Sequence, residues 1–126
     1  MNQDVWSVIG SYIENPYTVI GLIELGICSK NARVYFVGKY KIRTVDELNK
    51  IKGYNVIKLD CSRSSDIIEI PRELVNLEML WCTESIQVSE IPRELVNLKE
   101  LWCRNTRVSE IPRELVNLTM LECGNT

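Results

Sequence analysis

Apolar residues recur at a fixed interval through the last two thirds of the chain. A leucine returns after 21, 21 and 20 residues, and a cysteine follows each leucine two positions later. The pairs are Leu59 and Cys61, Leu80 and Cys82, Leu101 and Cys103, and Leu121 and Cys123. This period is typical of a solenoid, because one unit cannot bury its apolar residues alone and stacked units share a core.

The residues around each leucine predict a short strand. In Leu-x-Cys the first and third side chains point to one face of a strand, so Leu and Cys face the core and the residue between them faces outward. Equivalent outward positions form columns across neighbouring strands. The columns are Lys58, Met79, Glu100 and Met120; Asp60, Trp81, Trp102 and Glu122; and Ser62, Thr83, Arg104 and Gly124.

The segment EIPRELVNL occurs three times between these strands, at 69–77, 90–98 and 110–118. Its Ile and two Leu residues fall at i, i+4 and i+7, which is the spacing of one helical face. Proline suits the first position of a helix. We therefore expect each unit to return through a short helical turn. The Arg and Glu of PRELV would form like-charge columns on the outer surface, which we interpret as a solvated face.

The register LEMLWCTES, LKELWCRNT and LTMLECGNT resembles the leucine-rich repeat, with Cys at the third leucine of the motif and Ser or Thr at its asparagine. The resemblance covers about residues 55–126. It implies an α/β fold, a short solenoid of parallel strands with helical or 3-10 return segments and a concave sheet face. We expect hydroxyl side chains to replace the asparagine in bonding the backbone of adjacent turns. They are Ser64, Ser85, Thr106 and Thr126.

Residues 1–53 do not repeat and predict a helical cap, followed by about 3.5 repeat units in 54–126. Helices are expected in DVWSVIGSYI and after Asn15-Pro16. Ser29 is expected to cap a third helix that runs through KNARVYF. Thr44 and Glu47 form a capping-box pattern for a last helix that Gly53 closes. Such a cap would cover the open end of the solenoid core.

The same third of the chain resembles an F-box. Its first part is matched by Asp4, Val5, Ile9, Tyr12 and Ile13, and its second by Leu22, Leu25, Cys28, Ser29, Lys30 and Arg33. This resemblance implies docking to a ubiquitin-ligase linker protein. The combination of such a start with IPxELxNLxxLxC repeats is similar to proteins encoded by large DNA viruses of amoebae, of the marseillevirus or mimivirus kind. That similarity implies a host-protein adaptor or a virion-associated protein, and a plain cap is the alternative.

Composition narrows the class of partner. The net charge is −2 and no block of Lys or Arg stands out, so we expect no nucleic-acid partner. The sequence contains no run of about 18 apolar residues, so no membrane span is predicted. The start MNQDVWSVIG lacks the basic region of a signal peptide. We therefore expect an intracellular, reducing location, which is the host cytoplasm or the virion if the protein is viral.

The residue types of the chain give little support to a catalytic or metal-binding function. The chain has no histidine, and no nucleophile–base pair, phosphate loop or metal pattern is present, so we predict no enzyme, no cofactor and no metal. The cysteines lack the close pairs of structural zinc sites. On neighbouring strands about 4.8 Å apart, they are expected to form a buried column of thiols that behave as small apolar groups. Cys28 stands apart and is either a reactive thiol or a buried helix position.

Two tryptophans on adjacent strands are the main candidates for function. Trp and Arg are enriched among residues that carry binding energy at protein interfaces. The predicted partner-binding residues are Trp81, Trp102, Met79, Glu100, Arg104, Asp60 and Glu122. They predict a non-catalytic module that binds a protein partner. The alternatives are an F-box-like substrate adaptor for a host ubiquitin ligase and a self-assembling structural or virion-associated protein. The Trp pair has its own alternative, which is to shield its strands or to result from duplication.

The last predicted strand carries apolar residues and has no return segment after it. An unpaired strand edge of this kind invites association. We expect Leu121 and Cys123 to lie at an edge that a second copy covers in a two-fold contact, giving a homodimer.

Overall fold

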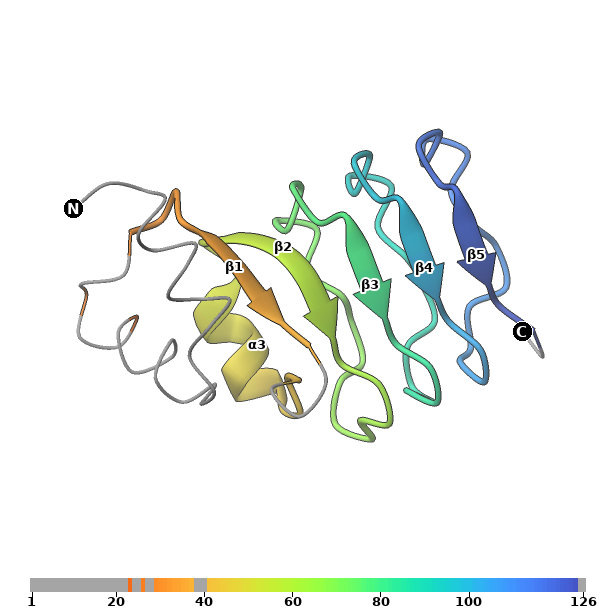
Figure 1. The fold of residues 1–126 in the computed structure, drawn as a ribbon. Helices are drawn as coiled ribbons and strands as arrows, with labels where there is room; N and C mark the ends of the chain where they lie inside the picture. Colours follow the sequence, from red (N-terminus) through yellow and green to blue (C-terminus); the bar gives the residue numbers. More distant parts are fainter. Residues whose placement is uncertain (1–22, 24–25, 27–28, 38–40, 125–126) are drawn as a thin grey trace.

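The computed structural model describes residues 23, 26, 29–37 and 41–124. Its elements form one parallel sheet in which each strand lies beside the strand that follows it in the chain (Figure 1). The elements are β1 (Arg33–Phe36), α3 (Val45–Ile51), β2 (Asn55–Asp60), β3 (Met79–Trp81), β4 (Glu100–Trp102) and β5 (Met120–Glu122). Sequential neighbours in a parallel sheet require a full coil between strands, so the predicted solenoid is confirmed.

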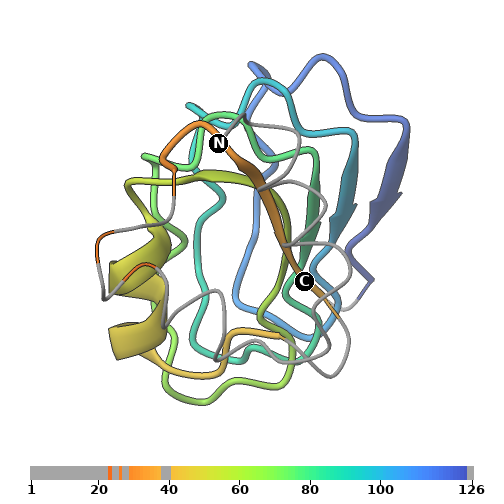
Figure 2. The ribbon, with the colours of Figure 1, turned by 60° about the vertical axis from the view of Figure 1, so that its left-hand side comes forward.

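Each coil has a strand on one side and a return segment on the other. Figure 2 shows the strands along one side of the coils, with α3 and the return segments opposite. Since α3 connects β1 to β2, it serves as the return segment of the first coil. Strand β1, which precedes the predicted boundary at residues 53 and 54, therefore pairs with β2, which follows it.

The core lies between strands and return segments and is built from stacked columns. Leu59, Leu80 and Leu101 are fully buried, as are the cysteines that follow them. The connectors and the repeated segment complete each layer. Their buried residues are Ile67, Val88 and Val108; Ile70 and Ile91; Leu74, Leu95 and Leu115; and Leu77 and Leu98. Full burial of one such side chain stabilises the fold by about 1.5–3 kcal/mol.

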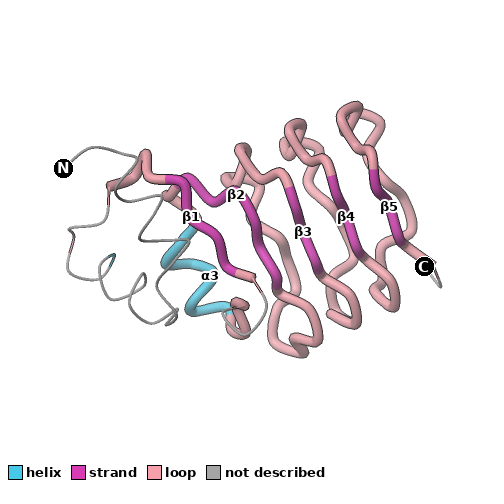
Figure 3. Tube along the Cα trace, viewed as in Figure 1, coloured by secondary structure: helices cyan, strands magenta, loops and turns pink. Residues whose placement is uncertain are grey.

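The return segments after β2, β3 and β4 are turns, so the prediction of helical or 3-10 segments is wrong for them (Figure 3). In the first of these segments the amide of Leu74 donates to Pro71 O at 3.3 Å, and Leu77 donates to Leu74 O at 3.1 Å. The carbonyl of Val75, which a helix would bond internally, instead accepts from Asn97 of the next coil. Bonds between coils thus replace the bonds that would continue a helix.

The segment predicted as a third helix is strand β1. Its side chains alternate, with Val34 and Phe36 buried and Tyr35 half-buried. Pairing with β2 satisfies its backbone, with one register irregularity between Val34 and Tyr35. The Val-Tyr-Phe run favours a strand once a neighbour is present. Apart from Ile23 and Gly26, the helices predicted within residues 1–28 lie outside the described residues. The elements described in the cap are one strand and one helix, so a cap of several helices is not supported.

The capping box of α3 is confirmed. Glu47 N donates to Thr44 Oγ1 at 3.1 Å, and Thr44 N donates to the Glu47 carboxylate at 3.2 Å. Leu48 and Ile51 point into the core. The amide of Val45 donates to an Asp66 carboxylate oxygen at 2.7 Å. This bond ties the start of α3 to the connector of the next coil.

Candidate functional site

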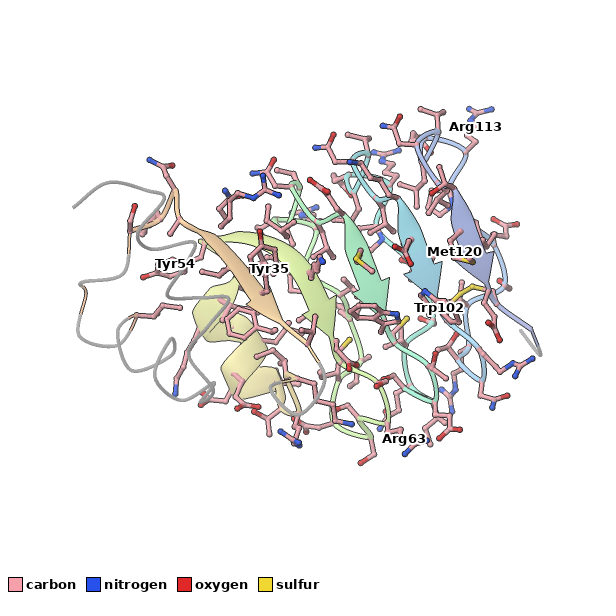
Figure 4. The ribbon with its side chains drawn as sticks, viewed as in Figure 1. Tyr35, Tyr54, Arg63, Trp102, Arg113 and Met120 are labelled. Carbon is pink, nitrogen blue, oxygen red and sulfur yellow. A yellow bond between two sulfur atoms is a disulfide. The ribbon has the colours of Figure 1, made fainter. Side chains whose placement is uncertain are left out.

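The side chains of β1–β5 that point away from the core form one continuous surface, which we call the sheet face. Strand pairing aligns these side chains in rows. One row is Lys58, Met79, Glu100 and Met120, and the next is Asp60, Trp81, Trp102 and Glu122. Figure 4 shows Tyr35, Trp102 and Met120 on this surface, on β1, β4 and β5. Most predicted partner-binding residues therefore lie in two adjacent rows.

Trp81 and Trp102 lie directly opposite each other on β3 and β4. Neighbouring strands are about 4.8 Å apart, so the two side chains are adjacent. Each residue is half-buried. The indole Nε1 of Trp102 is buried and has no hydrogen-bond partner in the described part of the chain. A buried donor without an acceptor costs about 1–3 kcal/mol, so this position is not optimised for stability alone.

The carboxylates at the two ends of the Trp row are engaged within the chain. One oxygen of Asp60 accepts from the amide of Ser62 at 3.0 Å and from its hydroxyl at 2.6 Å. Glu122 pairs with Arg104 at 3.4 Å from carboxylate oxygen to Nε. Arg104 also lies over Gly124, since a Cβ there would be 3.5 Å from its Nε. Glu122 and Arg104 therefore neutralise each other in an ion pair at the β5 end of the sheet face.

Glu100 differs from these carboxylates. It is half-buried on β4, opposite Met79 on one side and Met120 on the other. Its carboxylate makes no hydrogen bond or ion pair with any described residue. An unpaired carboxylate thus lies among apolar side chains beside the Trp pair.

The sheet face extends one strand further than the sequence analysis predicted. The ring of Tyr35 on β1 lies under the ammonium group of Lys58, 5.6 Å from the ring centroid. In the loops that follow β2 and β3, Arg63 Nε lies 3.3 Å from a carboxylate oxygen of Glu84. Tyr35 was missed because its segment was expected to be a helix, although the alternation in Val-Tyr-Phe carried the signal.

The cysteine column contains a disulfide between Cys103 and Cys123, so the prediction of four thiols is wrong at these two positions (Figure 4). Their Cα atoms are 4.7 Å apart on neighbouring coils, within the range that a disulfide needs. Cys61 and Cys82 are buried and free, as expected. The disulfide gives no support to the expected reducing compartment.

The two free thiols are chemically inert in the folded chain. Burial, and then the negative charge of Asp60, raises the pKa of Cys82 from 9.0 to about 12. Burial also raises the pKa of Cys61 well above its ordinary value, and neighbouring Cys82 and Asp60 add to the effect. Since the thiolate is the reactive and metal-binding form, these groups act as apolar core residues. Cys28 lies outside the described residues.

Polar ladders between coils lie at both ends of the strands. Ser64 Oγ donates to Arg43 O at 2.8 Å and Ser85 Oγ donates to Cys61 O at 2.6 Å, so both serve the preceding coil as expected. Thr106 donates to Cys103 O within its own coil, and Thr126 lies outside the described residues. A second ladder was missed. Asn97 and Asn117 of the repeated segment donate to the carbonyls of Val75 and Val96.

Strand β5 forms the far edge of the described sheet. Leu121 is 48% exposed there, whereas the equivalent leucines of β2, β3 and β4 are fully buried. Met120 is 45% exposed and Val116 is 80% exposed. Cys123, the other predicted edge residue, is half-buried and bonded to Cys103. The apolar residues of this coil are packed on one side only.

The return segments line an open groove of about 1240 Å³ beside α3. Its lining alternates in charge, with repeated Glu, Pro and Arg from EIPRE. Arg72, Arg93 and Arg113 form no ion pair with any described residue, and Figure 4 shows Arg113 at the outer side of the last coil. The many charged residues of this groove fit a solvated surface.

Of the F-box-like residues, only Ser29, Lys30 and Arg33 are described. Arg33 begins β1 and lies 3.9 Å from the Glu78 carboxylate, while Lys30 lies over the ring of Tyr54. These side chains therefore contact the first coils of the solenoid. The remaining residues of that resemblance lie outside the described ranges.

Comparison with models of known protein families and with curated protein sequences finds no match to this chain. Among the described residues, no helix is both long and apolar enough to cross a membrane. The same part of the chain holds no group of three or more Cys, Asp or Glu side chains placed to bind a metal ion.

Proposed function

We propose that this chain is a non-catalytic protein-interaction module of the leucine-rich-repeat kind, which binds a protein partner on its sheet face. The observation that carries the proposal is the Trp81–Trp102 pair. Two large aromatic side chains lie side by side, half-exposed, on a face that no described element covers. Aromatic residues at the centre of an exposed surface are typical of protein interfaces.

The energy available on this surface is adequate for specific binding. A Trp side chain buries 150–250 Å² when fully covered. Covering the exposed half of one indole, at about 25 cal/mol per Å², contributes about 2–3 kcal/mol. The half-exposed Met79 and the exposed Met120 add polarisable surface that adapts to a partner. The flanking charged residues would form the polar rim of such an interface.

The test is a Trp81→Ala/Trp102→Ala variant used as bait in extracts of the native source or its host. The proposal expects this variant to lose the proteins that the wild-type chain retains. The matched control is Glu73→Ala/Glu94→Ala, two substitutions on the return segments that leave the sheet face unchanged. Recovery of the same set of proteins by the Trp variant and the wild type would rule out the sheet face as the binding surface.

A direct measurement must then separate binding from folding. With a purified partner, the double Trp variant is expected to bind at least about 100-fold more weakly, given the buried area of two indoles. Thermal unfolding of both variants should be measured in parallel. If the Trp variant is folded and binds with wild-type affinity, the proposal is wrong.

A further inference from the structure

The charges of the sheet face leave one carboxylate without a partner. Asp60 accepts hydrogen bonds from Ser62, Glu84 pairs with Arg63, and Glu122 pairs with Arg104. Glu100 alone among the sheet-face carboxylates of the described residues has neither a hydrogen bond nor an ion pair. The unmatched negative charge therefore lies on an interior strand of the described sheet.

The surroundings of Glu100 are partly apolar and offer its charge no partner among the described residues. Glu100 and Trp102 are two residues apart on β4, so their side chains stand on the same side of the sheet. Met79 and Met120 lie opposite Glu100 on the two neighbouring strands. A carboxylate that is half-buried among apolar groups loses hydration and gains no compensating contact. A cation beside the carboxylate would compensate for the lost hydration.

No described residue supplies a cation for this position. The two cationic side chains nearest in the rows are Lys58 and Arg104, and both are engaged. The ammonium group of Lys58 lies over the Tyr35 ring, two strands away from Glu100. Arg104 is held by Glu122 and lies over Gly124. No described residue neutralises Glu100, and we take a partner as the source of the group that does.

We infer that the partner presents a cationic side chain, arginine above all, whose charge meets Glu100 and whose flat group lies against Trp81 and Trp102. This inference rests on the proposed function of the sheet face. A guanidinium group stacks on aromatic faces, binds carboxylates in a planar geometry and is more weakly hydrated than an ammonium group. The acidic groups at both ends of the Trp row, Asp60 and Glu122, disfavour an anionic partner at the same place.

The test uses two blocked pentapeptides as probes, Gly-Ala-Arg-Ala-Gly and the same peptide with citrulline. Citrulline keeps the shape of arginine and removes its charge. Binding is followed through the indole N–H signals of Trp81 and Trp102 in ¹⁵N NMR spectra, assigned with Trp81→Phe and Trp102→Phe variants. The substituted chain is Glu100→Gln, and Glu94→Gln on a return segment is the control because it changes the net charge by the same amount.

The arginine peptide should shift both indole signals in a saturable way, with about fivefold tighter binding than the citrulline peptide. Glu100→Gln should abolish that preference and Glu94→Gln should preserve it. Equal binding of the two peptides, an unchanged preference in Glu100→Gln, or no shift with either peptide would overturn the inference. If the purified partner still requires Trp81 and Trp102 in those cases, only the cationic contact is wrong. If it does not, the sheet-face proposal is wrong as well.

Discussion

Asn97 and Asn117 connect coils at the residue scale. Each donates its side-chain amide to a backbone carbonyl of the preceding coil, at 3.0 Å and 2.8 Å. The equivalent residue of the first repeated segment, Asn76, makes no hydrogen bond with its side chain to any described residue. The asparagine of the repeated segment thus forms its side-chain hydrogen bond only where another repeated segment precedes it in the solenoid.

This difference predicts unequal effects of the same substitution. Asn97→Ala is expected to lower the free energy of unfolding by about 1 kcal/mol, because the Val75 carbonyl loses its partner. Asn76→Ala is the matched control and should change it by less than about 0.5 kcal/mol. Urea denaturation of the two variants measures both values. Equal losses would show that the asparagine ladder does not stabilise the solenoid.

The last described coil has the most exposed apolar residues of the array. Its leucine on β5 is half-exposed and its valine, Val116, is 80% exposed, because packing comes from one side only. The disulfide between Cys103 and Cys123 ties this coil covalently to the one before it. It closes a loop that contains the whole return segment, since the two cysteines are 20 residues apart.

Removing the disulfide should therefore loosen the last coil selectively. Closing a loop of this size stabilises a chain by about 3 kcal/mol. A Cys103→Ser/Cys123→Ser variant, or the wild type in dithiothreitol, is expected to show faster amide hydrogen exchange in residues 112–124. The β2 and β3 strands should stay protected, and dithiothreitol should have no further effect on the double variant. Equal protection of residues 112–124 with and without reductant would contradict this role.

At the scale of the whole molecule, the first and last coils of the described solenoid differ. At one end β1 and α3 form the first coil, with buried residues such as Phe36, Ile42 and Ile51. At the other end β5 exposes Met120 and Leu121 with no strand beside it among the described residues. An apolar strand edge of this kind is a site for pairing with another chain.

We propose that a second copy of the chain covers this edge in a two-fold contact, in which the two β5 strands meet. Light scattering with size-exclusion chromatography should give the mass of a dimer for the wild type and of a monomer for Leu121→Lys. Leu121 is half-exposed, so the substitution should leave the fold intact, and circular dichroism checks this. The matched control is Val116→Lys, which places the same charge on the return segment of that coil. A monomeric wild type at high concentration would contradict the contact.

Much of the fold follows from the repeat period. The register placed Leu59, Leu80 and Leu101 inside and Trp81 beside Trp102, because a side chain two residues away on a strand must point the same way. The capping box at Thr44 could also be predicted from the sequence, since it depends on two residues that are three positions apart. Strand β1 and the turns after Pro71 and Pro92 could not be predicted in this way. Strand β1 depends on pairing with a strand of the next coil, and in the turns the carbonyls of Val75 and Val96 accept from asparagines of the next coil.

The sequence by itself determined the coil length, the core columns and the row of residues that faces outward, since these depend on spacing along one chain. Only the tertiary structure decided which groups have partners. It joined Cys103 to Cys123, held Arg104 on Glu122 and left Glu100 alone among apolar side chains. The physical reason is that hydrogen bonds, ion pairs and disulfides depend on distances of a few ångströms between atoms of different coils. The repeat pattern specifies which coils are neighbours, but side-chain packing sets those distances.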